Sequence, residues 1–487
     1  MKVAIAGHGK IDYCREAPFN PSNKYPEYPF NDLSKYNTVY DELRNLMVIL
    51  CMDKDNYNTS QWNPLGEIIK PGDHVLIKPN LVRHHSFDGY GIEHVITHGS
   101  LIRGLLDYVL IALKGKGSIT VGDAPIQEAD FEQIIKLAGI DKIMKFYEDN
   151  AAINVSLVDF RNIKGCRSNV GLIERKELKG DPLGYTAIDL GRDSELFGII
   201  EKYRKFRVTC YDSDEMLKHH NGSKNEYLIA NSVLNADVII NLPKLKTHRK
   251  SGITCALKNM IGTNCSKDWL PHYTTGSFQE GFDAYLYKSL RKRLLENLIE
   301  RMDRAKSVHI CFYLQLLYSF IYFTRRIIPF KDDFFEGSWY GNDTLPRTTI
   351  DINKIVSYAD KSGVMQNQIQ RKIFTVVDSI VAGEKEGPLH PTPKHCGLLV
   401  AGFNSTAIDL VCSAIMGFDY LKIPLFKYAL HSTKFTLFEG RVEDIKLSSD
   451  RCHKFNDLYE NSNYNFIPPQ GWKGHIEHLT KKNDRES

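Results

Sequence analysis

The stretch DHVLIKPN (residues 73–80) is a short apolar run that ends in polar residues, a pattern typical of a buried strand. It is followed by SLIRGLLDYVLIALK (residues 100–114), whose apolar residues have helical spacing behind a serine that can cap the helix. GSITVGDAP (117–125) indicates a second strand, residues 129–147 a second helix, and NVSLVDF (154–160) a third strand. This alternation predicts an α/β fold with a mostly parallel sheet covered by helices.

The alternation continues further along the chain and is interrupted once. ADVIINL (236–242) indicates another buried strand, and SGITCALKNMIG (251–262) indicates a helix entered through a basic loop. After a helical stretch, the pattern resumes at residues 373–383 and 396–418. We therefore expect mostly parallel sheets in two α/β portions with an inserted helical segment. The expected divisions are an N-terminal segment (1–69) packed on the first α/β portion (70–282), the helical insert (283–333), the second α/β portion (334–447) and a C-terminal tail (448–487).

The insert 283–333 begins as a basic amphipathic helix, YLYKSLRKRLLENLIERMDRAK, and continues into an uncharged apolar run at 308–324. That run has 17 residues, at the lower limit of the ~17 to 25 that span a bilayer, and it contains His309, Gln315 and Ser319. These features favour a buried helix of an accessory subdomain. A membrane-surface or oligomer contact and a bilayer span are the alternatives.

Composition excludes several classes of function. The chain has 63 basic and 59 acidic side chains, and this net charge of +4 does not favour a nucleic-acid partner. The N-terminus lacks the apolar stretch and cleavage site of a signal peptide, so we expect a cytoplasmic protein, with membrane association through the insert as an option. Ten cysteines without a C-x-x-C pair argue against zinc fingers, iron–sulfur clusters and disulfide frameworks.

The densest group of polar side chains lies around residue 250. The predicted strand 236–242 is followed by a basic loop and by a helix from about residue 251, where free backbone N–H groups would reinforce the cations. This arrangement predicts a site for a phosphate or carboxylate; a solvated loop is the alternative. The candidates for ligand binding are Lys244, Lys246, Arg249, Thr254 and Asn259, and the candidates for catalysis are His248 and Lys258.

Two neighbouring strands supply further candidates. Lys78 and Asn80 lie at the carboxyl end of one predicted parallel strand, and Asp123 ends the next. Open α/β sheets gather their ligands at this edge, so we expect all three side chains to point into one crevice. Lys78 and Asn80 are predicted to bind the substrate, and Asp123 to act in catalysis, with helix capping as the alternative for Asp123.

The second α/β portion contains a group of carboxylates beside glycines. Asp378, Glu384 and Glu386 are accompanied by Gly383 and Gly387. Carboxylates with glycine suit an oxygen-ligated divalent metal ion or an acid–base pair. For Glu384 and Glu386 the alternative is an exposed turn.

Five stretches of the chain resemble an uncharacterised family, domain-of-unknown-function family 362. They are PGDHVLIKPNLV (71–82), ITVGDAP (119–125), ADVIINLPKLKTHRKSGITCALKNMIG (236–262), GSWYGNDTLPR (337–347) and DSIVAGEKEGP (378–388). The resemblance implies a fold and a site location, but no activity. Some members of that family carry an iron–sulfur module, whose cysteine runs this chain lacks, so no cluster is expected.

A looser likeness is to the lactate racemase superfamily, whose members bind a nickel-pincer nucleotide through a lysine. His248 and Lys258 occupy a similar frame, which would make Lys258 the cofactor-bearing residue. The histidine–arginine element of those racemases is replaced here by residues 122–125.

These observations lead to three hypotheses. The first is an enzyme that binds a small anionic metabolite, such as a hydroxy acid, a sugar acid or a phosphorylated compound, and catalyses a racemase- or epimerase-like proton transfer. The second is a non-catalytic protein that uses the insert 283–333 to bind a membrane surface or a partner. The third is a redox role related to that of the iron–sulfur members of the family.

Overall fold

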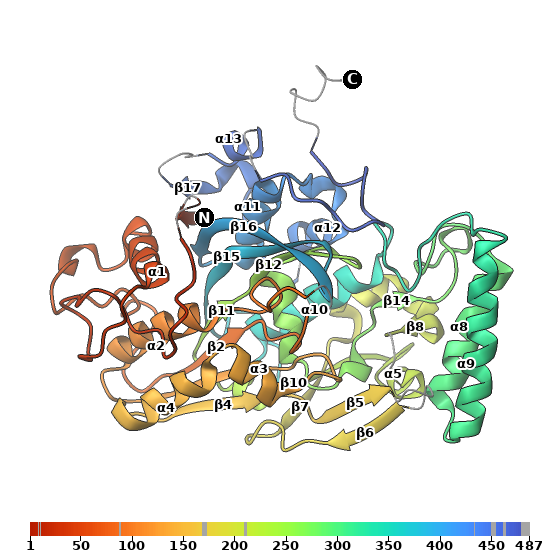
Figure 1. Cartoon of the computed structure of the whole chain (residues 1–487), viewed down its shortest axis with the longest axis horizontal. Helices are drawn as coiled ribbons and strands as arrows, with labels where there is room; N and C mark the ends of the chain where they lie inside the picture. Colours follow the sequence, from red (N-terminus) through yellow and green to blue (C-terminus); the bar gives the residue numbers. More distant parts are fainter. Residues whose placement is uncertain are drawn as a thin grey trace.

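A mixed, mostly parallel sheet organises the molecule (Figure 1). The computed structural model describes residues 1–7, 9, 11–86, 89–167, 173–208, 212–432, 434–449, 454–460 and 464–478, so the end of the predicted tail lies outside the described residues. The strand order is β17 (Lys446–Ser448), β1 (Lys2–Ala6), β16 (His390–Gly402), β15 (Lys372–Glu386), β11 (Val238–Leu242), β2 (His74–Pro79), β3 (Ser118–Asp123) and β4 (Val155–Asp159). The predicted α/β fold is confirmed.

The two predicted α/β portions share this sheet. Strand β15, from the second portion, pairs in parallel with β11, from the first, with Val238 opposite Lys372. Strands β11, β2, β3 and β4 are all parallel, and β16 turns back antiparallel to β15. The carboxyl ends of β2 and β3, which carry Lys78 and Asp123, therefore lie side by side.

Both faces of the sheet are covered, which is why the central strands β2 and β11 consist mostly of apolar residues. Successive side chains of a strand point to opposite faces, so Val75 and Ile77 of β2 pack in one core and Leu76 in another. The first core includes α1 (Thr38–Ile49), α2 (Gly99–Leu113), α3 (Phe131–Leu137) and α4 (Ile140–Asn150), and the second includes α10 (Thr344–Tyr358).

The helices on the first face differ from the sequence-based prediction in two details. His98, rather than Ser100, caps α2, because its Nδ1 accepts the backbone N–H of Ser100 at 3.1 Å. The single helix predicted over 129–147 is divided into α3 and α4 at Gly139, whose φ of 67° ends the first helix.

The predicted basic loop is a strand. Residues Lys244–His248 form β12, which pairs in parallel with β15 and antiparallel with β13 (Gly252–Thr254). Leu245 packs in the core and Lys244, Lys246 and His248 share the opposite face, in the two-residue period of a strand. The helix predicted from residue 251 is reduced to α7 (Ala256–Asn259) and a 3-10 turn, η4 (Met260–Thr263).

Smaller elements surround the sheet. On the second face lie α11 (Ser405–Met416) and α12 (Pro424–His431), with α13 (Phe455–Glu460) beyond them. The other small sheets and short helices lie outside the main sheet. They are β5 (Ile163–Arg167) with β6 (Ile173–Glu177), β7 (Tyr185–Asp189) with β10 (Lys224–Ala230) and β9 (His220–Asn221), β8 (Phe206–Arg207) with β14 (Tyr273–Thr274), η3 (Glu195–Lys205), α5 (Ser213–His219), α6 (Asn231–Leu234) and η5 (Lys267–Trp269).

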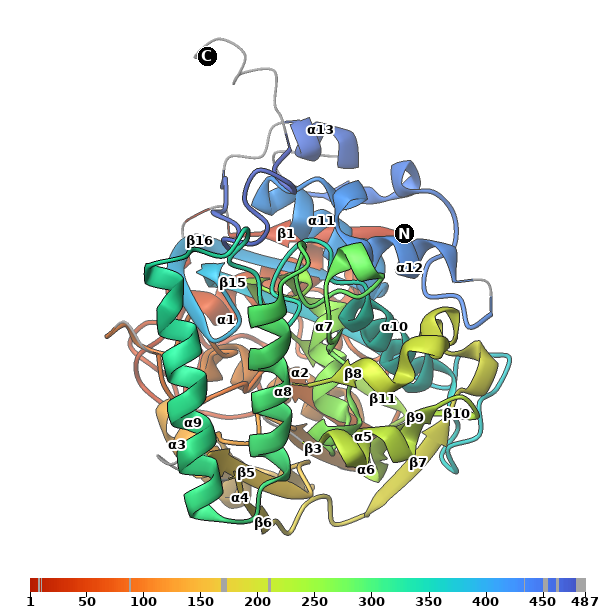
Figure 2. The ribbon, with the colours of Figure 1, turned by 90° about the vertical axis from the view of Figure 1, so that its right-hand side faces the viewer.

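The insert forms a helical hairpin at one edge of the molecule (Figures 1 and 2). It consists of α8 (Leu290–Arg304), α9 (Val308–Phe323) and η7 (Thr324–Arg326). The favoured prediction of a buried helix is wrong for α9, in which only Cys311 and Ile321 are buried. In the part of the chain that the structure describes, no helix is long and apolar enough to cross a membrane.

Candidate functional site

A cavity of about 310 Å³ lies at the carboxyl ends of β2 and β3 and is roofed by β12, β13 and η5. Its apolar wall includes Val82, Ala124, Ile261 and Leu270. Its polar lining is Asn80, Asp123, Gln127, Glu128, Lys246, His248, Arg249, Lys250, Thr254, Lys258, Asn259, Lys267, His272 and Glu336. The structure thus brings together eight of the thirteen predicted site residues.

Lys246 reaches this cavity from β12. Its ammonium group donates to Asn80 Oδ1 at 2.9 Å and to the carbonyl of Val95 at 2.5 Å. Burial lowers the pKa of Lys246 well below its ordinary value, and the nearby charge of Lys244 lowers it further. Among the described residues no carboxylate forms an ion pair with Lys246, so its charge lacks a direct counterion.

Lys258 and Lys267 extend this positive charge. Burial lowers the pKa of Lys258 from 10.5 to about 7, and the charges of Lys267, Lys250 and Lys78 act in the same direction. The pKa of Lys267 falls to about 8, again chiefly through burial. Within the described ranges, the Lys258 ammonium has no hydrogen-bond or ion-pair partner. It is therefore available to a ligand, and half of it is neutral near pH 7.

Two histidines beside Lys258 have opposite tautomers. His248 Nδ1 accepts the backbone N–H of Lys250 at 3.0 Å, so the neutral ring carries its proton on Nε2. His272 Nδ1 lies 2.7 Å from the carbonyl of Leu270 and must donate to it, so its Nε2 is an acceptor. Burial lowers the pKa of both rings well below the usual value, and Lys258 is the largest charged contributor in each case.

These tautomers assign different chemistry to the two rings. His248 can donate to a ligand through Nε2–H, whereas the nitrogen that would accept a proton is already occupied. His272 offers a free lone pair on Nε2 and is the better candidate for a base. The sequence-based prediction named His248 and missed His272.

Three buried polar atoms around the cavity have no hydrogen-bond partner in the part of the chain that the structure describes. They are Thr254 Oγ1, Gln127 Nε2 and Arg249 Nε. Each of these atoms is a hydrogen-bond donor, and buried donors are normally satisfied. Unsatisfied donors beside uncompensated lysines are the complement of a ligand with several anionic oxygens.

Asp123 is engaged by the scaffold. Its Oδ1 lies 2.7 Å from the Lys78 ammonium, and its Oδ2 accepts the backbone N–H of Leu81 at 2.7 Å. Glycine at position 262 makes room for this pair, because a Cβ there would lie 2.0 Å from Asp123 Oδ1 and 2.7 Å from Lys78 Nζ. Lys78 itself does not line the cavity. We assign this ion pair to holding the ends of β2 and β3.

Asn259 connects β2 to β11. Its amide nitrogen donates to the carbonyl of Lys78 at 3.0 Å and to Asn241 Oδ1 at 2.7 Å, and its Oδ1 accepts from Asn80 at 3.1 Å. Asn80, which also contacts Lys246, is therefore held in one orientation. Its predicted position at the strand edge agrees with the structure.

The N-terminal N–H groups of the helix that was expected to bind an anion are already bound by a carboxylate of the protein. The Asp409 carboxylate accepts the backbone N–H of Ala256 at 2.6 Å and that of Leu257 at 3.0 Å. Burial raises the pKa of Asp409 to about 7. The predicted contribution of a helix end is therefore wrong, and side chains supply the positive potential.

The second predicted group does not join the cavity. Asp378 Oδ2 lies 2.7 Å from Lys244, and Asp378 Oδ1 accepts the Tyr13 hydroxyl at 2.5 Å, with all three groups buried. The contribution of Lys244 to ligand binding is therefore not supported, because its charge is neutralised within the scaffold.

The predicted metal site does not form from Asp378, Glu384 and Glu386. Glu384 binds Lys394 at 3.3 Å and the backbone N–H of residue 467, and Glu386 accepts the backbone N–H of residue 470. These contacts are spread along β15 rather than gathered at one point. Across the described residues, no group of three or more His, Cys, Asp or Glu side chains is arranged to hold a metal ion.

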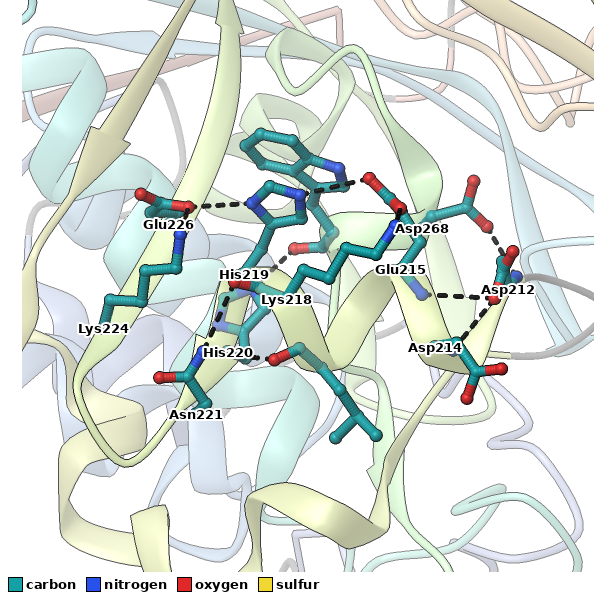
Figure 3. Close-up of polar contacts among 12 residues, drawn as sticks. Asp212, Asp214, Glu215, Lys218, His219, His220, Asn221, Lys224, Glu226 and Asp268 are labelled. Atoms are coloured by element: carbon teal, nitrogen blue, oxygen red, sulfur yellow. Dashed lines mark hydrogen bonds and ion pairs between the residues drawn. The ribbon is translucent and has the colours of Figure 1, made fainter.

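A separate polar cluster fixes the turn that carries Lys267 (Figure 3). Asp268 accepts from Arg175 at 2.9 Å and from the backbone N–H of Asp212 at 2.7 Å. The next residue, Trp269, stacks on His219 with ring centroids 3.3 Å apart. The cluster also contains Glu215, Lys218, His220, Asn221, Lys224 and Glu226. Lys267 and His272 thus reach the cavity from a segment that tertiary contacts position.

Together, these features define an α/β protein with a lysine-rich cavity at the carboxyl edge of its sheet. The family model described as a domain of unknown function, DUF362, matches residues 75–172 and 186–414, which is more than half of the chain. The protein therefore belongs to the DUF362 family. The likeness to the lactate racemase superfamily is not shown by these comparisons and stays a prediction.

Other comparisons add less. No curated protein matches the chain. Among solved structures, one match is the crystal structure of a Thermotoga maritima protein from a structural-genomics consortium, with 10% sequence identity and a TM-score of 0.30. The match covers 75% of this chain and 54% of that one, so the chain spans about half the length of that protein.

Proposed function

We propose that the protein is an enzyme that binds a small anionic metabolite in the lysine-rich cavity and transfers a proton to or from it. The observation that carries this proposal is the presence of Lys246 and Lys258 at the cavity without carboxylate partners among the described residues. Burying a cation without a counterion costs free energy, and a bound phosphate or carboxylate would supply the missing charge.

The same residues support proton transfer. Lys258 has a pKa of about 7, near the value at which a group can both take up and release a proton at neutral pH. His272 offers an acceptor nitrogen and His248 a donor, and all three groups influence one another electrostatically. A carbon acid next to a carboxylate, as in a hydroxy acid or a sugar acid, would meet both a base and a hydrogen-bond donor. This chemistry is that of a racemase or an epimerase.

The first test is binding. Thermal unfolding is followed with phosphate, sulfate and a panel of hydroxy acids and sugar acids, because a ligand at 100 times its Kd stabilises the folded state by about 2.7 kcal/mol. We expect at least one anion to stabilise the wild type and to lose most of its effect with Lys258→Met. Lys145→Met is the matched control, since Lys145 is exposed and pairs with Glu148 on the surface.

The second test is the reaction. Stabilising anions are incubated with the protein in D₂O, and deuterium at the carbon next to the carboxylate is measured by mass spectrometry. We expect exchange with the wild type and a loss of at least 100-fold with His272→Gln. If no anion of the panel stabilises the protein, the binding site is refuted. If anions bind without exchange, the cavity is a binding site and the proposed proton transfer is wrong.

A further inference from the structure

The hairpin of α8 and α9 presents an apolar surface that the proposed reaction does not use. Of the 26 exposed large hydrophobic side chains in the described part of the chain, twelve lie between residues 290 and 328. On α9 the outward face consists of Phe312, Tyr313, Leu316, Leu317, Phe320 and Phe323, with exposed fractions between 46% and 69%. Such a concentration on one element is typical of an interaction surface.

The inward face of α9 packs against α8. Ile321 packs with Leu295 and Leu298 of α8, and Leu314, Tyr318 and Tyr322 pack against that cluster. The hairpin therefore does not need its outer face for its own stability. Figure 2 shows α8 and α9 side by side in front of the body of the molecule, which leaves that outer face accessible.

Cations without carboxylate partners flank the apolar face at both ends. Lys306 lies two residues before the start of α9, and Arg325 and Arg326 lie in η7, two and three residues after its end. Between residues 288 and 331 the chain has ten basic and three acidic side chains. Over the residues that the structure covers, no ion pair neutralises Lys306, Arg325 or Arg326, whereas Arg304 of α8 binds Asp214 at 2.6 Å.

We propose that α9 docks on the surface of an anionic membrane and lies parallel to it. A helix of 16 residues is about 24 Å long, so in this orientation both basic ends reach the headgroups while the aromatic face enters the interface. The uncharged α9 segment is too short to span the bilayer, and aromatic rings prefer the interfacial layer.

Charge complementarity favours a membrane over a second copy of the chain. Two α9 helices packed antiparallel would bring Lys306 of one copy close to Arg325 and Arg326 of the other. Like charges at that distance repel, whereas each cation is attracted to an anionic bilayer. The apolar face and the basic ends thus suit the same partner.

Co-sedimentation of the full chain with vesicles tests this proposal. We expect binding to vesicles of phosphatidylcholine with 30% phosphatidylserine, and at least tenfold weaker binding to phosphatidylcholine alone. Replacing two exposed rings, in the double variant Tyr313→Ser/Phe320→Ser, should weaken binding at least tenfold. Arg325→Gln/Arg326→Gln should reduce binding to anionic vesicles and its dependence on salt.

The matched control is Ile369→Ser/Leu421→Ser, which removes two similarly exposed apolar side chains far from the hairpin in sequence. We expect this control to bind like the wild type, and all variants to keep the wild-type unfolding temperature. No binding to anionic vesicles at low salt, or equal binding by the Tyr313/Phe320 variant, overturns the proposal. Self-association in sedimentation velocity that the same variant abolishes would instead identify a second copy as the partner.

Discussion

Replacing Lys258, a half-buried residue, by methionine should make the ligand-free protein more stable, whereas most substitutions destabilise a protein. A fall in the pKa of Lys258 from 10.5 to about 7 corresponds to about 5 kcal/mol, because a tenfold change in proton affinity is worth about 1.4 kcal/mol. Water in the cavity and relaxation of neighbouring side chains reduce this value. We therefore expect a gain of about 1 to 3 kcal/mol at pH 6.5.

The pH dependence of the stability gained with Lys258→Met shows whether the gain comes from removing a charge or from better packing. The folded state holds the proton of Lys258 less tightly than the unfolded state does, so the charge penalty is complete below about pH 7. Between pH 7 and 10.5 the folded protein has a neutral Lys258 while the unfolded chain is still protonated, and the penalty shrinks. The gain from Lys258→Met should therefore fall to about a third of its value by pH 9.5.

Urea unfolding midpoints at pH 6.5, 8 and 9.5 measure this difference. Lys145→Met should leave the unfolding midpoint close to that of the wild type at every pH, because Lys145 is exposed on the surface. A loss of stability with Lys258→Met at pH 6.5 would show that the ammonium group is compensated. A gain that is the same at all three pH values would attribute the effect to packing.

Three further predictions concern the scaffold. Asp123→Asn should destabilise the protein by about 3 to 5 kcal/mol and Lys78→Met/Asp123→Asn by less, as measured in urea, because the single variant leaves a buried charge unpaired. Asp378→Asn should lower the unfolding temperature equally with and without a chelator, because Asp378 binds Lys244 and Tyr13. An effect that depends on the chelator would support the predicted metal site instead. Trp269→Ala should weaken anion binding at least threefold, because the loss of its stacking on His219 would displace Lys267. A variant with the affinity of the wild type would show that the indole ring is not needed to position this turn.

The strands and helices of the sheet could be predicted because their signals are local. Residues 75–77 are apolar, and the strand is buried from residue 75 to residue 79. The basic segment was misassigned as a loop although its order, lysine, leucine, lysine, threonine, histidine, has the two-residue period of a strand. The basic composition of the segment outweighed its periodicity in that prediction, because runs of charged residues are typical of loops.

The remaining errors have tertiary causes. Lys267 and His272 come from a segment with no periodic pattern, and Asp268 positions that segment through Arg175, which lies 93 residues earlier. Gly383 and Gly387, which were expected to lie beside a metal ion, allow neighbouring backbone segments to pack closely. A Cβ at Gly387 would lie 2.0 Å from the carbonyl of Thr247, so glycine there permits β12 to approach β15.

Four lysines at the carboxyl edge of the sheet belong to two groups that no sequence pattern separates. Lys78 and Lys244 each have a carboxylate at 2.7 Å, so their charges hold neighbouring strands together. Lys246 and Lys258 face the cavity, and over the described ranges no carboxylate is bound to either. A cation with a partner is explained by the stability of the fold, whereas a cation without one reduces that stability. Lys246 and Lys258 can therefore contribute most to the free energy of ligand binding. A bound anion would neutralise their charges and remove the free-energy cost of holding them in the folded protein without a counterion.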